Sequence, residues 1–194
     1  MEKITSLSQL DMTKQYSYAD YLTWWFDDRV ELIRGYIMKM APAPSDGHQK
    51  YSFNLVLALG NLLGNKTCQV RYAPYDVRLT RTVNDREIIT VVQPDICVIC
   101  DLTLLDARGC NGAPTMIIEI LSESNRKHDL VTKFNLYEEA GVLEYWILYP
   151  LDEIIEVYHL INNKYILDKK YIEDEVISVK TIDGLEINLK DIFC

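Results

Sequence analysis

Two acidic residues lie inside apolar runs that have the length and composition of buried strands. Asp95 stands between Val91-Val92 and Ile96–Ile99, and Glu119 lies within Thr115–Leu121. An ionised carboxylate on a buried strand costs several kcal/mol by order of magnitude unless another group pairs with it or it coordinates a ligand. Because two such residues occur in successive predicted strands, they predict a shared ligand.

A divalent cation is the ligand that this pair predicts. Pro94 fixes an extended backbone at a point where the ladder of the sheet is broken, directly before Asp95. If the two strands are neighbours, Asp95 and Glu119 could hold Mg²⁺, with Mn²⁺ as the alternative, because Mg²⁺ takes a few hard oxygens and keeps several waters. Such a metal polarises a phosphoryl oxygen and generates hydroxide from bound water. This chemistry needs a further group, usually a cation, to stabilise the developing negative charge.

The position of that cation is less direct. The side chain two residues beyond Glu119 shares its face of the strand, and it is Leu121, which carries no charge. The candidate is Lys133 on the following predicted helix. Asp129 lies four residues before Lys133, so an exposed ion pair worth about 0.3 to 0.5 kcal/mol is the alternative. Composition alone favours this ion pair.

Several short motifs occur in an order that is typical of one known family. They are Gln93-Pro94-Asp95, 118–122, 129–133 and 137–146, preceded by 31–35, 42–48 and the region around Asp76. Together they cover nearly the whole chain and closely resemble the Uma2-type restriction endonucleases, a large prokaryotic family within the PD-(D/E)xK nuclease superfamily. No single motif is specific, but the ordered set is.

The resemblance implies a restriction-endonuclease-like core in which Asp95 and Glu119 are the metal ligands. It also implies that the lysine of the usual third motif has moved from the strand to the next helix, where Lys133 becomes the catalytic cation. Leu121 occupies the superfamily's usual lysine position. This departure leaves catalytic competence open.

Three further residues are additional candidates for the site. Glu31 belongs to the family pattern, although it could instead pair with Arg29 or Arg34. His48 follows a turn and opens a helix, where it could cap the helix or contact a phosphate or a metal-bound water. Asp76 lies between Val-rich strand halves and could be a further ligand.

The predicted elements that position these residues form an α/β fold with a mixed central sheet flanked by helices. Before the sheet we expect a helix over 17–27, a hairpin over 29–41 that turns at Gly35, and a helix over 48–63 that stops at Gly64. Strands follow over 68–80, 88–101, 115–121 and 142–149, the first two interrupted at Pro74 and Pro94, with a turn at 83–86 and a loop over 101–114.

A helix over 126–140, ended by Gly141, connects the last two of these strands and predicts a crossover unit. A β-rich C-terminal extension completes the chain, with strands near 154–160, 164–167 and 176–179 and a short strand and helical turn over 185–193. The 194 residues fit a single domain, 1–194, with its core at about 46–150.

Composition and charge limit the classes of function. The chain is 48% apolar and 25% charged, which is typical of a soluble globular protein. It has neither a signal peptide nor a run of about 18 apolar residues, so we expect no membrane span and a cytoplasmic location. A net charge of -9 argues against a protein that coats nucleic acid by charge alone. Basic residues between Lys66 and Arg86 could form a local basic rim, or a solvated strand edge.

The cysteines do not predict a disulfide framework. Their number is odd, at positions 68, 97, 100, 110 and 194, and their spacing is loose. Cys97 and Cys100 form a Cys-x-x-Cys, but residues three apart on a strand face opposite sides, and no second ligand pair completes a zinc site. We therefore expect two ordinary buried cysteines.

These observations favour a Mg²⁺-dependent endonuclease that hydrolyses DNA phosphodiester bonds through a metal-activated water. Because a duplex has two strands and such a domain has one site, fold-level analogy predicts a homodimer. The alternative is a non-catalytic nuclease-fold protein that binds nucleic acid or a protein partner, which acidic charge and Leu121 both favour. A third reading is a purely structural crossover protein, in which Asp95 and Glu119 bond to the backbone or to arginine.

Overall fold

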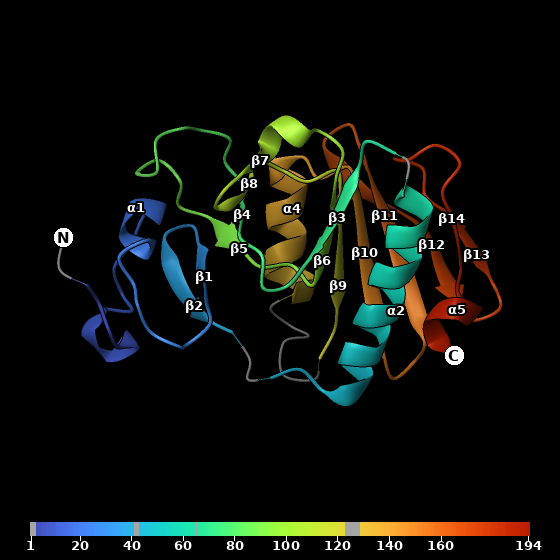
Figure 1. Cartoon of the computed structure of the whole chain (residues 1–194), viewed down its shortest axis with the longest axis horizontal. Helices are drawn as coiled ribbons and strands as arrows, with labels where there is room; N and C mark the ends of the chain where they lie inside the picture. Colours follow the sequence, from blue (N-terminus) through green and yellow to red (C-terminus); the bar gives the residue numbers. More distant parts are fainter. Residues whose placement is uncertain (1–2, 41–42, 65, 123–128) are drawn as a thin grey trace.

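A computed structural model describes residues 3–40, 43–64, 66–122 and 129–194. The fold is α/β, with two six-stranded mixed sheets and one small two-stranded sheet. Figure 1 shows the blue N-terminal segment at one end of the molecule and the red C-terminal segment at the other. None of the helices in the described part of the chain combines the length and the apolar character that crossing a bilayer requires.

The central sheet is the predicted mixed sheet. Its strands lie in the order β12-β11-β10-β9-β6-β3. Their bounds are β3 (Gln69–Tyr72), β6 (Ile96–Ile99), β9 (Met116–Ile120), β10 (Glu144–Tyr149), β11 (Ile154–Ile161) and β12 (Lys164–Ile172). β9 and β10 are parallel, whereas the other neighbours are antiparallel. The sheet therefore contains one parallel pair, which requires a crossover connection.

That crossover is the predicted one between β9 and β10. It contains a π-helical turn, η3 (Asp129–Lys133), which continues into α4 (Phe134–Ala140). Gly141 ends α4 in a left-handed conformation at φ 86°, and its N–H bonds to the carbonyls of the last turn. The first residues of the predicted helix, 126–128, lie outside the described residues.

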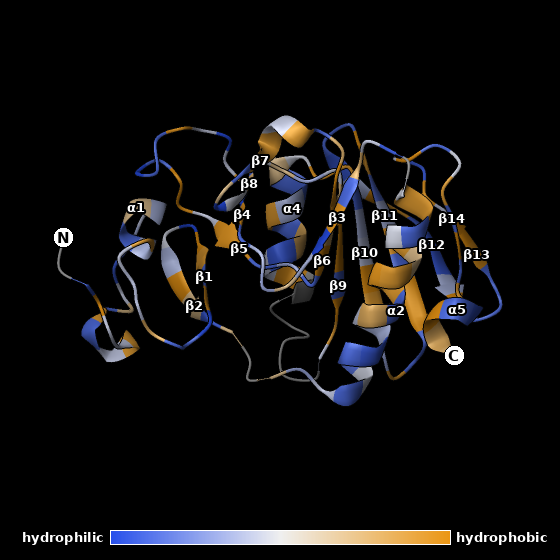
Figure 2. Cartoon of the chain, viewed as in Figure 1, coloured by the Kyte–Doolittle hydropathy of each residue, from blue (hydrophilic) through white to orange (hydrophobic). Residues whose placement is uncertain are grey.

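Side-chain alternation gives the central sheet two buried faces. Ile96 and Val98 pack on one face, against α2 (Asp46–Leu63) and α5 (Lys190–Phe193), whereas Cys97 and Ile99 pack on the opposite face with α4. α2 covers its face through residues spaced every four along the helix: Tyr51, Leu55, Leu59 and Leu63. Figure 2 shows the hydrophobic colour along the strands of this sheet and both colours around α2. This spacing gives α2 one buried face, and the predicted end of the helix at Gly64 is confirmed.

The second large sheet, the N-terminal sheet, has the order β2-β1-β5-β4-β8-β7. Its strands are β1 (Val30–Ile33), β2 (Tyr36–Lys39), β4 (Val77–Arg78), β5 (Val91–Val92), β7 (Leu105–Asp106) and β8 (Gly109–Asn111). The hairpin of β1 and β2 turns at Gly35, as predicted. The loop predicted over 101–114 is partly wrong, because it contains η2 (Leu102–Leu104), β7 and β8. Gly109 lets β8 approach β4, since a Cβ there would lie 2.2 Å from the Asp76 carbonyl oxygen.

The first helix is shorter than predicted. α1 (Tyr18–Tyr21) begins where expected, with the Asp20 carboxylate accepting from the backbone N–H of Ser17 at 2.8 Å. It ends well before Asp27 because the following backbone pairs with Ile4, whose carbonyl accepts from the N–H of Trp25. A short 3-10 turn, η1 (Leu7–Gln9), precedes it.

Two prolines direct the chain from one large sheet to the other. The predicted strand over 68–80 is divided at Pro74 into β3 of the central sheet and β4 of the N-terminal sheet. The strand over 88–101 is divided at Pro94 into β5 and β6, again in different sheets. Asp95 therefore stands where the chain enters the central sheet. The C-terminal extension is β-rich as predicted, with β13 (Val176–Ser178) pairing with β14 (Glu186–Asn188) before α5.

The cysteine prediction is wrong for one pair. Cys68 and Cys100 form a disulfide. The antiparallel register of β3 and β6 pairs Gln69 with Ile99, so the next residue outward on each strand meets its partner directly. Sequence spacing could not show this, because strand pairing brings the two together. Cys97 is a buried free cysteine, as expected.

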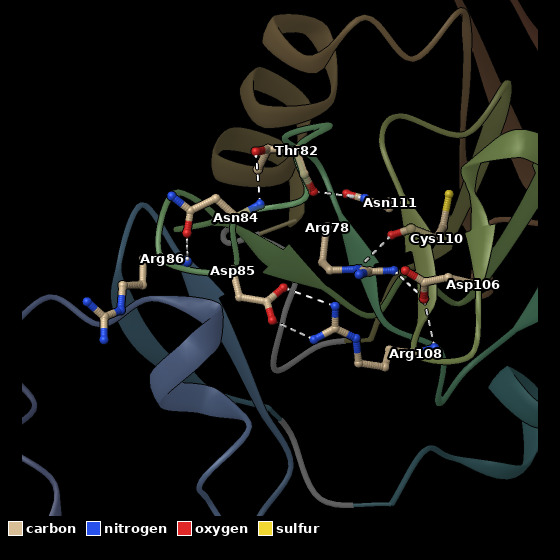
Figure 3. Close-up of polar contacts among 9 residues, drawn as sticks. All are labelled: Arg78, Thr82, Asn84, Asp85, Arg86, Asp106, Arg108, Cys110 and Asn111. Carbon is tan, nitrogen blue, oxygen red and sulfur yellow. Dashed lines mark hydrogen bonds and ion pairs between the residues drawn. The ribbon is translucent and has the colours of Figure 1, made fainter. Parts of the chain in front are cut away.

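The basic residues between 66 and 86 do not gather into one rim. Arg78 is fully buried, and its guanidinium donates to Asp106 Oδ1 at 2.7 Å and to the Cys110 carbonyl at 3.2 Å. Figure 3 shows Arg78 turned toward these partners, and Arg86 pointing away from them. Arg81 lies 3.4 Å from Asp101. Lys66 and Arg71 lie elsewhere, beside and on β3 of the central sheet, so these cations are distributed over both large sheets.

The packing of α2 gives a test of the core. Leu59 is fully buried, whereas Leu57 on the same helix is 51% exposed. We expect Leu59→Ala to lower the free energy of unfolding by about 2 to 5 kcal/mol, because it leaves a cavity. Leu57→Ala should change it by less than about 0.5 kcal/mol. Urea denaturation measures both, and equal losses would contradict this packing.

Candidate active site

A cleft of about 800 Å³ opens at the end of the central sheet where Asp95 enters it. The first turns of α2, the end of β3, the end of β9 and η3 all contribute to its walls. Lining residues with polar or aromatic side chains include Arg29, His48, Tyr72, Asp95, Glu119 and Lys133. The cleft therefore brings together the three residues predicted to be catalytic.

The strands that carry the two carboxylates are neighbours, as the shared-ligand hypothesis requires. β6 pairs with β9 so that Ile96 is opposite Ile118, and the next pair outward is Asp95 and Glu119. Asp95 Oδ2 accepts from the backbone N–H of Ile120 at 2.8 Å. This bond holds the Asp95 carboxylate across the end of β9.

Lys133 is buried between two carboxylates. Its Nζ lies 2.9 Å from Glu31 Oε1 and 3.1 Å from Glu119 Oε1, and the residue is only 4% exposed. The alternative was an exposed ion pair with Asp129, and it is wrong in that Lys133 is not exposed. The side chain of Asp129 is outside the part that the structure describes. The helix places its lysine at the strand glutamate.

Glu31 takes a different partner from those that its neighbours in sequence suggested. It pairs with Lys133, and its Oε1 also accepts from the backbone N–H of Gln93 at 2.8 Å. Arg34 pairs with Glu139 at 2.7 Å, and Arg29 donates to the Gln93 side chain at 3.0 Å. Glu31 thus connects β1 of the N-terminal sheet to the cleft.

Tyr137 contacts the candidate site, although the sequence did not single it out as a candidate. Its hydroxyl donates to Glu119 Oε1 at 2.6 Å, and its side chain is fully buried. Burial, together with the charges of Glu119 and Glu31, raises the pKa of Tyr137 well above its ordinary value. The available signal was spacing, because Tyr137 follows Lys133 by four residues and shares its helix face.

His48 contacts the other carboxylate. Its Nε2 lies 3.2 Å from Asp95 Oδ2, and its side chain is 12% exposed. α2 begins two residues earlier than predicted, with Ser45 as the N-cap accepting from the backbone N–H of His48 at 3.3 Å. The histidine therefore lies in the first turn of α2 and faces the cleft.

Asp76 lies behind the cleft rather than on its wall. The Gln93 side-chain amide donates to Asp76 Oδ1 at 2.9 Å, and the Tyr21 hydroxyl lies 3.5 Å from the same oxygen. Burial raises the pKa of Asp76, against the hydrogen bonds from Gln93 and Tyr21, which lower it. Asp76 is not among the residues that line the cleft in the described part of the chain.

The donor set suits a mostly hydrated hard cation better than a closed protein cage. Within the described residues no three acidic, histidine or cysteine side chains form a metal-binding group. Mg²⁺, however, is commonly held by one or two carboxylates and keeps several waters. The Asp95 contacts to His48 and to Ile120 both use Oδ2. Asp95 and Glu119 both line the cleft and supply the oxygen ligands that such an ion takes, and their binding of Mg²⁺ stays a prediction.

Known proteins resemble this chain in sequence or in structure. Residues 18–190 match the model of the Uma2 family, described as "Putative restriction endonuclease". The uncharacterized protein slr1290 of Synechocystis sp. is 26% identical over 146 residues, which cover 74% of this chain and 73% of that protein. A crystal structure of a putative nuclease belonging to DUF820, from Anabaena variabilis ATCC 29413, has a TM-score of 0.65 at 19% identity. The superposition with that structure covers 92% of this chain and 97% of the Anabaena chain.

The lysine bridge predicts a large effect on stability. We expect Lys133→Met to lower the free energy of unfolding by about 3 to 5 kcal/mol, because it leaves two buried carboxylates without their shared cation. Adding Glu31→Gln should restore part of the loss by removing one charge. Lys164→Met, at an exposed lysine, is the control and should have little effect. Urea denaturation measures the free energy of unfolding of each variant. Equal losses in Lys133→Met and Lys164→Met would contradict the bridge.

The raised pKa of Asp76 predicts a pH dependence. Because the folded protein holds the Asp76 proton more tightly than the unfolded chain, whose aspartate pKa is about 3.9, wild-type stability falls as pH rises through the folded pKa. Asp76→Asn removes this loss. The free energy of unfolding of the variant, relative to that of the wild type, should therefore be higher at pH 7 than at pH 3. Unfolding curves that show the same difference at both pH values would argue against a buried, ionising Asp76.

Proposed function

The chain belongs to the Uma2 family, whose description is "Putative restriction endonuclease", and we propose that it is a metal-dependent endonuclease that hydrolyses DNA phosphodiester bonds. The observation that supports this most directly is the cleft itself. Asp95, Glu119 and Lys133 come from three different elements and line one cavity. A purely structural crossover would not need these three groups at a common opening.

In this proposal Asp95 and Glu119 hold Mg²⁺, with Mn²⁺ as an alternative. The ion, when bound, supplies a Lewis acid for a phosphoryl oxygen and lowers the pKa of a water. His48, 3.2 Å from Asp95 Oδ2, orients one ligand. Tyr137, 2.6 Å from Glu119 Oε1, orients the other. Ligands held in this way need little reorganisation when the substrate enters.

Lys133 takes the role of the cation that the superfamily usually carries on the strand. Leu121, at the usual position, is buried and apolar. Lys133 reaches the same glutamate from η3, and Glu31 fixes it from the other side. In the reaction its ammonium orients the attacking water and stabilises the negative charge that develops on the phosphate.

A homodimer is part of the same proposal. Each chain presents the catalytic cleft once, in its described part, and a duplex has two strands to cut. Two copies related by a twofold axis would present one cleft to each strand. Light scattering in solution distinguishes a dimer from a monomer directly.

Cleavage of DNA tests the catalytic assignment. With Mg²⁺ or Mn²⁺ we expect the wild type to cut DNA, and Asp95→Asn, Glu119→Gln and Lys133→Gln each to reduce the rate by roughly 100-fold or more. Circular dichroism should first show that each variant is folded. Asp174→Asn, at an exposed ion pair with Lys190, is the control and should cut normally.

Activity that survives all three substitutions would end this assignment. Folded wild-type protein that binds nucleic acid in a salt-sensitive manner but never cuts it would instead support the non-catalytic alternative.

A further inference from the structure

Tyr72 is an exposed aromatic residue at the rim of the cleft. It is the last residue of β3, the edge strand of the central sheet, and it is 61% exposed. An exposed ring costs little when it is scattered on a surface, but this one lines the cavity that holds Asp95 and Glu119. Its flat faces are available to a ligand in that cavity.

The backbone fixes Tyr72 to the same frame as the candidate metal ligand. Tyr72 pairs with Ile96, the residue after Asp95, in the antiparallel register of β3 and β6. The N–H of the next residue, Ala73, donates to the Asp95 carbonyl at 3.0 Å. The backbone that carries the ring is therefore fixed relative to the backbone of Asp95, and both side chains line the same cleft.

The described lining of the cleft offers few cations to a double helix held by its phosphates. A duplex carries a negative charge about every 1.7 Å of its axis, and proteins that grip it neutralise many of them. Among the described residues that line the cleft, the basic side chains are Arg29, His48 and Lys133; His48 contacts Asp95, and Lys133 is shared by two carboxylates. Arg29 is exposed and near the rim, with its guanidinium on the Gln93 side chain.

We propose that the cleft takes an unpaired DNA strand, with one base stacked on Tyr72 and the adjoining phosphate facing Arg29. Base stacking on aromatic side chains is the usual way to hold single strands without reading their sequence. The inference rests on the proposed nuclease function for the identity of the ligand as DNA. It deepens that function by naming the form in which each cleft takes its DNA strand: unpaired, as at a frayed end or a gap of a duplex, so that the two clefts of a dimer would each take one opened strand.

Equilibrium binding without metal tests this inference apart from catalysis. A fluorescently labelled 12-nucleotide strand and the blunt duplex of the same sequence are titrated with the full chain in EDTA, and anisotropy is measured. We expect tighter binding to the single strand. Tyr72→Leu should weaken that binding roughly 10-fold, whereas Tyr72→Phe should preserve it, because stacking uses the ring. Tyr36→Leu, at another exposed tyrosine on β2, is the matched control and should bind as the wild type does.

The outcomes separate this inference from the proposed function. Binding to the duplex that equals or exceeds binding to the strand, an unaffected Tyr72→Leu, or no binding to either form would overturn the inference. Strand binding that depends on Tyr72 without cleavage in Mg²⁺ would support the inference and refute the nuclease. Cleavage of duplex DNA by the wild type and by Tyr72→Leu alike would support the nuclease and refute the inference.

Discussion

The buried ion bridge from Glu31 through Lys133 to Glu119 is the interaction on which the architecture of the cleft depends. Each of the three residues comes from a different part of the fold: β1 of the N-terminal sheet, η3 of the crossover and β9 of the central sheet. Burial makes the loss of one partner costly, because it leaves a largely buried charge without its ion pair. The three elements must therefore meet in one arrangement for the chain to fold, and the same arrangement places a cation beside the candidate metal ligands.

The path of the chain between the two large sheets brings these elements together. Pro74 and Pro94 each interrupt a strand, and on either side of the interruption the chain belongs to a different large sheet. Asp95 lies at the second of these transitions, where its side chain accepts a hydrogen bond from the backbone N–H of Ile120 in β9. A residue at such a junction lies at the end of the sheet, facing the cleft. Lys133 is buried and contributes to the stability of the fold, whereas Asp95 is partly exposed and accessible from the cleft.

Local patterns predicted what is set locally. The end of α2 at Gly64, the turn at Gly35, the stop at Gly141 and the breaks at the two prolines all follow from residues close in sequence, and the structure confirms them. One error is local, because the predicted loop over 101–114 contains the short hairpin of β7 and β8. The other errors concern contacts between distant segments. The disulfide of Cys68 and Cys100 depends on the register of β3 and β6, and the end of α1 depends on pairing with Ile4. Likewise, the sequence suggested Lys133 as the cation but could not show that Glu31 would be its second partner, because that contact spans about a hundred residues of chain.

The central claim is that Asp95 and Glu119 hold a divalent cation in a cleft completed by Lys133. Isothermal titration of Mn²⁺ into the folded chain tests it most directly, because it needs no substrate and no turnover. The account predicts saturable binding that Asp95→Asn and Glu119→Gln each abolish or strongly weaken, while Asp174→Asn leaves it unchanged. Binding of the same affinity in all three variants would contradict the account.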